Sequence, residues 1–309
     1  MEFKKAVVTG GAGFIGSHIA QVLLEKNIET TVVDNLYMGN VDYVPKGARF
    51  IKMDIMDVNQ LEDIFKGVDV VFHEAAHVTI RNSINNFYED AYINIMGTIN
   101  VIRAVIKSRV KKLIYASSMG VYGQPQELPI KEVHRLEPIS PYGISKLSGE
   151  KYCLQMATFH DFTAVSLRYF NTFGTRQTLT PYVGVITIFI NRLLKGQRPI
   201  IFGDGEQIRD FVSVSDVALA NILAMERVKN GQIINIGSGK GTTVNEVAHL
   251  LIERMAPTLS AEYAPPQAGE TGSSVADINR AFQYIGYKPK YSLEDKTNEI
   301  IEWNKRHSQ

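Results

Sequence analysis

The sequence contains almost no cysteine, no long apolar run and no excess of charge of one sign. Cys153 is the single cysteine among 309 residues, which excludes an internal disulfide and a zinc site built from thiolates. No apolar run approaches the roughly 18 residues that a membrane span requires. The 33 lysines and arginines nearly balance the 32 aspartates and glutamates, whereas proteins dedicated to nucleic acids or membrane surfaces usually carry a basic excess.

These shortages predict a cytoplasmic protein without a nucleic-acid or membrane partner. A predicted strand at 5–9 begins so near the first residue that we expect no signal peptide ahead of it. We expect Cys153 to be a small buried apolar residue. No metal site is predicted. The spacing between histidines is not that of metal ligands at His73, His77, His134 and His160.

What is present is the composition of a folded α/β protein, with 45% hydrophobic and 21% charged residues. Apolar runs that read as strands alternate with helical periods over the first 170 residues. Strands are expected at 5–9, 30–34, 49–54, 68–73, 112–117 and 163–168, and helices at 14–26, 61–65, 88–108 and 142–160. Continuously apolar strands separated by helices are typical of a parallel, doubly wound sheet covered on both faces.

The length predicts about two domains at roughly 150 residues each. We expect residues 1–170, joined by 212–236, to form the domain that contains the parallel sheet. Beyond residue 170 the alternation loosens, and proline and glycine cluster. A smaller α/β domain is therefore expected from 171–211 and 237–309, with a cleft between the two domains.

A glycine-rich turn joins the first predicted strand to the first helix, with the sequence Thr9-Gly-Gly-Ala-Gly-Phe-Ile-Gly16. Glycine allows a tight turn and a close approach of the backbone to a pyrophosphate, and the helix N-terminus offers free N–H groups to it. The motif in this strand–turn–helix context predicts dinucleotide binding. The residues expected to bind are Gly10, Gly13, Phe14, Ile15 and Gly16.

Acidic residues at two strand ends predict which dinucleotide is bound. Asp34 ends the second strand, where a carboxylate accepts hydrogen bonds from the adenosine ribose and repels a 2′-phosphate. No lysine or arginine follows it in Asn35-Leu-Tyr-Met38, so NAD is favoured over NADP. Asp54, followed by Ile55, ends the third strand and is expected to bind the adenine amine. The alternative for Asp54 is a helix N-cap.

A Tyr-x-x-x-Lys motif, Tyr142-Gly-Ile-Ser-Lys146, opens the helix at 142–160. Spacing by four places both side chains on one face of the helix, and a nearby ammonium lowers the pKa of a phenol. Ser118 follows the fifth strand, at the edge of the sheet where ligands bind. We expect Tyr142, Lys146 and Ser118 to converge as the catalytic group. The alternative is a surface tyrosine with a solvated lysine.

With these motifs the chain resembles the extended short-chain dehydrogenase/reductase family, in which the parallel sheet is a Rossmann fold. Within that family it looks most like the nucleotide-sugar 4-epimerases. The segments that carry the resemblance are Thr9–Gly16, Asp34-Asn35, His73-Glu-Ala-Ala76, Ser117-Ser-x-x-Val-Tyr-Gly123, Pro141-Tyr-Gly-x-Ser-Lys146, Arg168-Tyr-Phe-Asn171 and Gly203-Asp-Gly-x-x-x-Arg-Asp-Phe211.

The resemblance implies a role for each matching position. Tyr142 would be the base, Ser118 its hydrogen-bonding partner, and Lys146 would also hold the nicotinamide ribose. Residues 1–170 would bind NAD and the smaller domain the substrate. The remaining positions would be Ala75 and Ala76 along the cofactor channel, Asn171 on the nucleotide-sugar and Arg209 on its diphosphate. The alternatives for Asn171 and Arg209 are a loop-capping amide and an ion pair with Asp210.

The reaction implied is inversion at C4 of a UDP-hexose through a transient 4-keto sugar. The substrates would be UDP-glucose and UDP-galactose, with UDP-GlcNAc and UDP-GalNAc as further candidates. Sister 4,6-dehydratases carry an Asp-Glu pair after the serine, and decarboxylases carry a glutamate there. This chain has Met119-Gly120 instead, which favours the epimerase. The alternatives are those sister reactions and, outside enzymes, an NAD-sensing protein.

Three further expectations come from the resemblance. Ser274 aligns with the position that limits space near the sugar C2 substituent, and a small residue there is similar to enzymes that accept N-acetylated sugars; the neighbouring Ser273 is small as well. Gln267 stands where the family usually has a second arginine for the diphosphate. The helices at 88–108 and 143–160 would form the interface of a homodimer.

Overall fold

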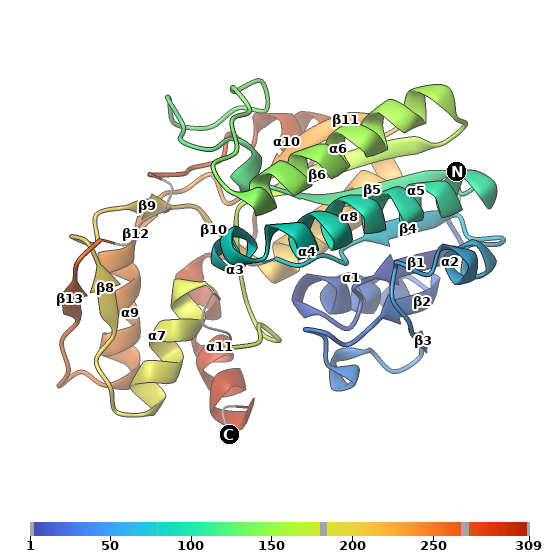
Figure 1. Ribbon diagram of the computed structural model, residues 1–309. Helices are drawn as coiled ribbons and strands as arrows, with labels where there is room; N and C mark the ends of the chain where they lie inside the picture. The colour runs from blue at the N-terminus through green and yellow to red at the C-terminus, as the bar shows by residue number, and fades with distance from the viewer. Residues whose placement is uncertain (1–2, 79, 180–183, 267–271, 308–309) are drawn as a thin grey trace.

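The computed structural model of the protein describes residues 3–78, 80–179, 184–266 and 272–307. Its centre is a seven-stranded parallel sheet with the strand order β11-β6-β5-β4-β1-β2-β3 (Figure 1). The expected α/β doubly wound fold is confirmed. The strands are β1 (Lys5–Thr9), β2 (Glu29–Asp34), β3 (Arg49–Lys52), β4 (Val70–His73), β5 (Lys112–Ser118), β6 (Thr163–Tyr169) and β11 (Gln232–Ile236).

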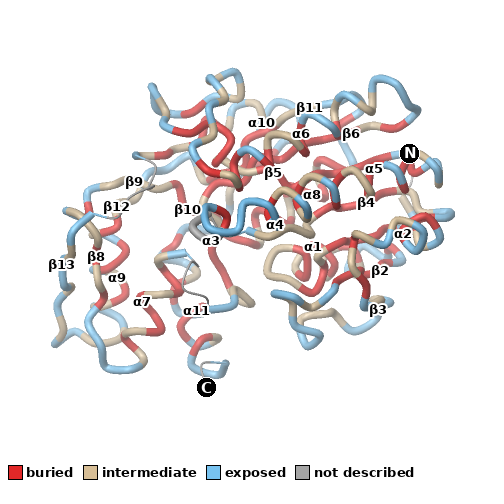
Figure 2. Tube along the Cα trace, viewed as in Figure 1, coloured by how far each residue is buried: buried red, intermediate tan, exposed pale blue. Residues whose placement is uncertain are grey.

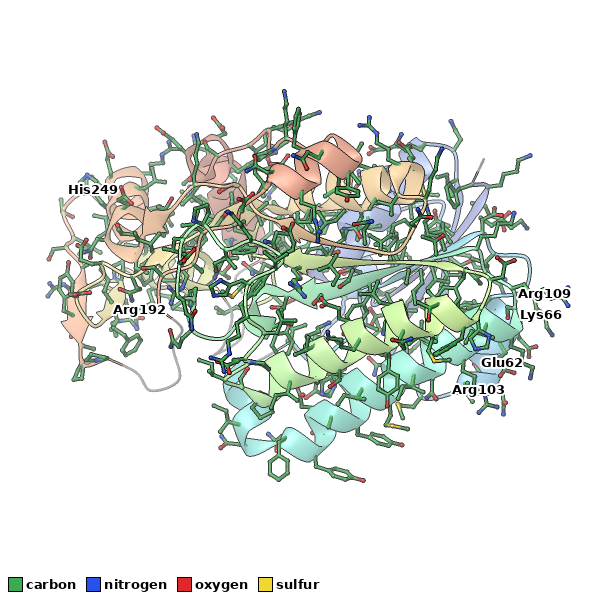
Figure 3. All side chains as sticks on the ribbon, turned by 90° about the horizontal axis from the view of Figure 1, so that it is seen from above. Glu62, Lys66, Arg103, Arg109, Arg192 and His249 are labelled. Carbon is green, nitrogen blue, oxygen red and sulfur yellow. The ribbon has the colours of Figure 1, made fainter. Side chains whose placement is uncertain are left out.

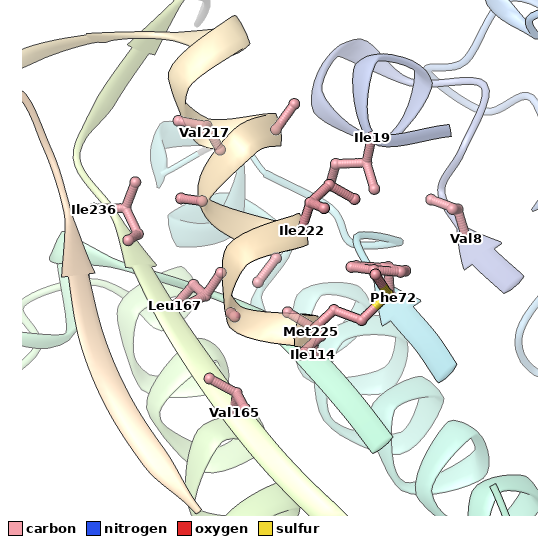
Figure 4. Close-up of a cluster of buried hydrophobic side chains, with 14 of the residues drawn as sticks. Val8, Ile19, Phe72, Ile114, Val165, Leu167, Val217, Ile222, Met225 and Ile236 are labelled. Carbon is pink, nitrogen blue, oxygen red and sulfur yellow. The ribbon is translucent and has the colours of Figure 1, made fainter. Parts of the chain in front are cut away.

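Helices cover both faces of this sheet, which explains why its strands are apolar throughout. One face packs against α1 (Phe14–Glu25) and α8 (Val214–Arg227). Figure 4 shows α8 lying on the sheet, with Val217, Ile222 and Met225 directed at the strands. The other face packs against α2 (Val58–Ile64), α5 (Gly97–Lys107) and α6 (Pro141–Phe159). Cys153 is buried there, as predicted.

The inner strands of the sheet are buried almost along their whole length, whereas the edge strand β3 and the outward faces of the covering helices are partly exposed (Figure 2). Residue 232 pairs with residue 165, so β11 returns late in the chain to extend the sheet beside β6. That position supports the assignment of 212–236 to the first domain, and the domain boundaries stay a prediction.

A smaller second lobe lies beside the carboxyl ends of the strands (Figure 1). Its core joins α7 (Val185–Leu194), α9 (Val244–Met255) and α11 (Leu293–His307). α10 (Asn279–Ile285) packs instead against α8 and β11. The short strand pairs are β7 (Asn171–Phe173) with β10 (Phe211–Ser213), β8 (Ile200–Phe202) with β13 (Glu262–Ala264), and β9 (Ile208–Arg209) with β12 (Thr242–Thr243).

The single helix expected at 88–108 is wrong in detail. The segment contains α4 (Phe87–Ala91), a π-helical turn η2 (Tyr92–Met96) and α5. The wider turn presents Asn94 to the loop after β4, where its side chain exchanges two 2.8 Å hydrogen bonds with the backbone N–H and C=O of His77. π-Helical turns of this kind are frequent at functional sites. The other short helices are α3 (Ile80–Asn85), η1 (Val41–Tyr43) and η3 (Met119–Val121).

Among the residues that the structure describes, no helix combines the length and the hydropathy of a membrane span. The same residues bring together no group of three histidine, cysteine or acidic side chains that could hold a metal ion. The cytoplasmic location stays a prediction.

Candidate active site

A cavity of about 370 Å³ opens at the carboxyl ends of β1, β2, β4, β5 and β6. This is the edge at which doubly wound sheets bind their ligands. The structure gathers there every residue that the sequence predicts to bind the cofactor or to act in catalysis. They are Gly10, Gly13, Phe14, Ile15, Gly16, Asp34, Asn35, Asp54, Ile55, Ala75, Ala76, Ser118, Tyr142 and Lys146.

The glycine turn brings the backbone close to the neighbouring strand. Gly10 has a positive φ of +69°, and a side chain on it would collide with the backbone N of Ala75 at 2.6 Å. α1 then begins at Phe14 with Gly13 as its N-cap, so no side chain caps the first turn. The N–H groups of that turn and the positive end of the helix dipole face the cavity, which suits a pyrophosphate.

Asp34 is held in place by the backbone around it. Its carboxylate accepts hydrogen bonds from the N–H of Ala12 at 3.0 Å and of Leu36 at 2.8 Å. Burial raises the pKa of Asp34, and these two hydrogen bonds partly offset the effect. The carboxylate is therefore fixed at the cavity wall, in the geometry that recognition of a ribose diol requires.

Asp54 lies two residues beyond β3, which ends at Lys52. Its carboxylate accepts from the side-chain amide of Asn35 at 2.8 Å and from the N–H of Met56 at 2.9 Å. The N-cap of α2 is Asp57, which accepts from the N–H of Gln60. The alternative interpretation of Asp54 as the cap of that helix is therefore wrong, and its predicted contact with adenine stays open.

Tyr142 and Lys146 come from the first turns of α6, and Ser118 ends β5. All three side chains meet at the cavity, so the alternative of a surface tyrosine with a solvated lysine is wrong. The Lys146 ammonium donates to the carbonyl oxygen of Ala116 at 2.8 Å, and its Nζ lies 6.0 Å from the centroid of the Tyr142 ring. Tyr142 is 9% exposed and Lys146 3%.

The expected lowering of the Tyr142 pKa by Lys146 is not found in this structure. Burial raises the pKa of Tyr142 to about 12, a hydrogen bond with Ser118 opposes this, and the charges of Asp90 and Glu74 add to it. Burial also lowers the pKa of Lys146 to about 8, against the opposing effect of the same two carboxylates. Desolvation therefore dominates both groups.

Glu74 is the site residue to which the sequence assigned no role. It follows β4 directly and lines the cavity, and its Oε1 accepts a 2.8 Å hydrogen bond from the Tyr169 hydroxyl. Burial raises the pKa of Glu74 to about 7, with Tyr169 and Lys146 acting in the opposite direction. The available signal in the sequence was the acidic residue itself, which stands between His73 and two alanines in the motif His73-Glu-Ala-Ala76.

Other cavity residues were missed because nothing in their local pattern marks them. Tyr37 and His77 stack at the cavity with their ring centroids 4.5 Å apart, although they come from loops after different strands. Tyr169, Gln177 and Thr178 also line the cavity. His73, expected to be structural, is buried between hydroxyl groups of Thr9 and Thr98 at 2.8 and 3.0 Å.

Three of the residues predicted to bind the substrate, Asn171, Arg209 and Ser274, lie outside the lining of this cavity. Arg209 and Ser274 are bridge partners in the second lobe, and the Arg209 guanidinium donates to the carbonyl oxygen of Gly272 at 2.6 Å. The Asp210 carboxylate accepts hydrogen bonds from Ser238 and from the N–H groups of Gly239 and Ala276, which accounts for its burial.

Two of the predicted substrate residues each have a buried side-chain oxygen without a hydrogen-bond partner in the described parts of the chain. Asn171 Oδ1 and Ser274 Oγ are buried and make no hydrogen bond within the described parts of the chain. A buried polar atom without a partner destabilises the fold, and such atoms often mark the place of a ligand. Ser273 Oγ instead accepts from the N–H of Ile208 at 3.3 Å. Gln267 lies outside the described residues.

Comparison with known proteins places this cavity in context. The model of the "NAD dependent epimerase/dehydratase family" matches residues 6–237. A Methanocaldococcus jannaschii protein, provisionally named a UDP-glucose 4-epimerase, is 43% identical over 304 residues, covering 98% of this chain and 99% of that protein. A UDP-N-acetyl-alpha-D-glucosaminuronate decarboxylase of Bacillus cytotoxicus is 33% identical over 314 residues and 97% of each chain.

Solved structures with the same fold include two epimerases. The UDP-glucose 4-epimerase of Thermotoga maritima, solved with UDP-glucose, has a TM-score of 0.95 and 39% identity, covering 99% of this chain and 100% of that one. The UDP-N-acetylglucosamine 4-epimerase of Methanobrevibacter ruminantium, solved with UDP-N-acetylmuramic acid, has a TM-score of 0.94 and 36% identity, with coverage of 99% and 100%.

Proposed function

Because this chain belongs to the NAD-dependent epimerase/dehydratase family, we propose that it is a UDP-sugar 4-epimerase that retains its NAD. The family confirms the prediction of NAD as the cofactor. The observation that carries the proposal is the meeting of Tyr142, Lys146 and Ser118 in the cavity that also contains the glycine turn and Asp34.

The residues present fit NAD. The uncapped first turn of α1 would receive the pyrophosphate, Asp34 the adenosine ribose, and Lys146 the nicotinamide ribose. When bound, NAD supplies a reversible hydride acceptor and, in its oxidised form, a positive charge. The contribution of the protein is to orient the sugar and to move the proton of its 4-hydroxyl group.

Tyr142 is the group proposed to take and return that proton. Its side chain shares the cavity with Ser118, whose hydroxyl could complete a short relay between the sugar oxygen and the phenol. With a pKa raised to about 12, Tyr142 is a neutral phenol at neutral pH, so the phenolate has to be stabilised by positive charge in the loaded site. Lys146, bound to the Ala116 carbonyl, is the protein's own source of that charge.

The segment after Ser118 favours epimerisation over the sister reactions. Met119 begins η3 and packs beside a buried cluster that contains Val121 and Tyr122. A thioether and a glycine cannot remove a proton at C5 or assist the loss of CO₂, and the decarboxylase relative therefore does not determine the activity. The Ser118–Met119–Gly120 segment supports return of the hydride as the fate of the keto sugar.

The test is incubation of the purified protein, without added cofactor, with UDP-glucose and separately with UDP-N-acetylglucosamine. We expect the anomeric proton signals of the galacto epimer to appear in the NMR spectrum although no free NAD has been supplied. A persistent keto sugar or released CO₂ would instead identify a sister reaction. No change with either sugar, in protein shown to contain NAD, would refute the proposal.

We predict that Ser274 sets the preference between these two sugars. Ser274→Tyr is expected to lower the rate with UDP-N-acetylglucosamine at least about tenfold more than the rate with UDP-glucose, because the ring would fill space near C2. Ser274→Ala serves as the control and should leave the ratio of rates unchanged. Since Ser274 is 0% exposed, thermal unfolding of both variants must be measured beside the rates. An equal loss for both sugars in folded protein would contradict this role.

We also propose a homodimer, formed through the apolar outer faces of α4 and α6. The two helices lie side by side, and Phe87, Tyr88 and Phe159 are 64%, 77% and 70% exposed on them (Figure 1). Light scattering should give twice the chain mass of 34.5 kDa, and Tyr88→Glu should shift it toward the monomer. Tyr263→Glu, at a tyrosine 59% exposed in the second lobe, should leave the dimer intact. A monomeric wild-type protein would refute the proposal.

A further inference from the structure

The position of Glu74 at the cavity is determined by three neighbouring elements. In β4 and β5, His73 pairs with Tyr115, so the next residue, Glu74, lies beside Ala116. Ala116 is the residue whose carbonyl oxygen binds the Lys146 ammonium at 2.8 Å. Glu74 and Lys146 therefore reach the same cavity from opposite faces of the sheet, Glu74 from the α8 side and Lys146 from α6.

A chain of hydrogen bonds holds the Glu74 carboxyl group from behind. Asn221 of α8 donates its amide to the Tyr169 hydroxyl at 2.8 Å, and that hydroxyl donates to Glu74 Oε1 at 2.8 Å. Asn221 is itself fixed by a 2.9 Å hydrogen bond from its amide to the carbonyl oxygen of Val217. The chain holds one carboxyl oxygen of Glu74, a residue that lines the cavity.

Three titratable side chains face the Glu74 carboxyl group. Lys146 and Tyr142 face it from α6, and Tyr169 from β6. Burial raises the pKa of Tyr169 well above its usual range, and Tyr142 is a neutral phenol, so neither carries charge near neutral pH. Asp90 faces Lys146 and Tyr142 rather than Glu74.

We propose that the ionised Glu74 carboxylate makes this cavity prefer oxidised over reduced NAD, by stabilising the cationic nicotinamide of NAD⁺ relative to the neutral ring of NADH. This deepens the proposed function and rests on it, because Lys146 is the residue assigned there to the nicotinamide ribose. An epimerase that must begin each cycle with an oxidised cofactor needs such a preference. Lys146, as the opposite charge, limits the preference while it is protonated.

The preference should depend on pH with a definite sign. Glu74 loses its proton near neutral pH, so its stabilisation of NAD⁺ is absent below about pH 6 and present above about pH 8. Deprotonation of Lys146, whose pKa is about 8, removes a positive charge and strengthens the preference at higher pH. The ratio of the dissociation constants of NADH and NAD⁺ should therefore rise with pH in two steps, of which the lower belongs to Glu74.

The test first removes the retained cofactor from the full-length protein, then equilibrates the protein with mixtures of NAD⁺ and NADH from about pH 6 to pH 9 and measures the composition of the bound cofactor. No UDP-sugar is present, so the result is independent of turnover. Glu74→Gln, which keeps the shape of the side chain, should abolish the lower step and reduce the ratio at pH 8 by roughly tenfold, the size expected for unit charges roughly 10 Å apart at an effective dielectric constant of about 20.

Tyr169→Phe provides a second readout that a purely structural role of Glu74 would not produce. Loss of the hydroxyl donor should raise the Glu74 pKa, because that hydrogen bond lowers it, and the lower step should shift to higher pH while keeping its size. If Glu74→Gln does not fold, the shift of the lower step in Tyr169→Phe still tests the proposal, and an unshifted step would contradict it.

Glu62→Gln is the matched control. Glu62 is a carboxylate 6% exposed on α2, and Figure 3 shows it near Arg103 at the end of the molecule away from Arg192 and His249 in the second lobe. It should bind the two cofactor forms as the wild type does. A Glu74→Gln protein with the wild-type ratio and both steps would overturn the proposal. A Glu62→Gln protein that showed the reduced ratio and lost the lower step would overturn it as well.

Discussion

Replacing Tyr142 with phenylalanine is expected to lower the epimerisation rate by about 10²–10⁴-fold, the usual contribution of a group that transfers the reacting proton. The variant loses only the phenol hydroxyl, and the ring that forms part of the cavity wall remains. The bound NAD content should therefore stay at the wild-type level. NMR rates with UDP-sugars and the cofactor released on denaturation measure the two quantities.

Tyr152→Phe is the matched control, because Tyr152 belongs to the same helix but is 46% exposed and lies outside the cavity lining. Its rate should equal that of the wild type. A Tyr142→Phe enzyme that retains its full rate together with its NAD would show that another group moves the proton. A variant that loses NAD as well would show that Tyr142 also holds the cofactor.

The second large effect is expected on stability, at the ion pair between Arg168 and Glu150. Both side chains are 0% exposed, and Arg168 contacts the two carboxylate oxygens at 2.5 and 2.9 Å. Ser117 and Ser166 each donate a 2.9 Å hydrogen bond to the same carboxylate, and Arg168 also donates to the Tyr122 hydroxyl at 2.9 Å. The pair thereby ties α6 to β5 and β6, behind the residues of the active site.

Arg168→Met should lower the free energy of unfolding by about 3–5 kcal/mol, because it leaves a buried carboxylate without its positive partner. Urea denaturation followed by circular dichroism measures this change. The double variant with Glu150→Met should recover part of the loss, since both charges are then gone. Lys66→Met, which breaks an exposed pair with Asp63, should have no measurable effect. An unchanged urea midpoint in Arg168→Met would contradict the stabilising role given to this ion pair.

Much of the cofactor end of the site could be predicted because its residues act through local backbone geometry. The strand, the glycine turn and the helix N-terminus occupy consecutive positions, so their sequence pattern is already their spatial arrangement. Asp34 follows the same logic, because a residue at the end of a parallel strand must lie at the carboxyl edge of the sheet. Tyr142 and Lys146 share a helical face by their spacing alone.

The errors came where contacts are made between distant segments. Asp54 was assigned to a strand end with a helix cap as its alternative, yet β3 stops at Lys52 and Asp57 caps α2. The helix expected at 88–108 contains a π-helical turn because Asn94 bonds with the loop at His77. No local pattern encodes that contact.

The sequence by itself determined the order of strands and helices, the glycine turn and the spacing of the catalytic residues, because each depends on neighbours within a few positions. Only the tertiary structure decided the charge states at the site. The pKa values of Tyr142, Lys146 and Glu74 are set mainly by burial, in a cavity whose walls come from elements distant in the sequence. Desolvation depends on everything packed around a group, which is why it appears only when the whole chain has folded.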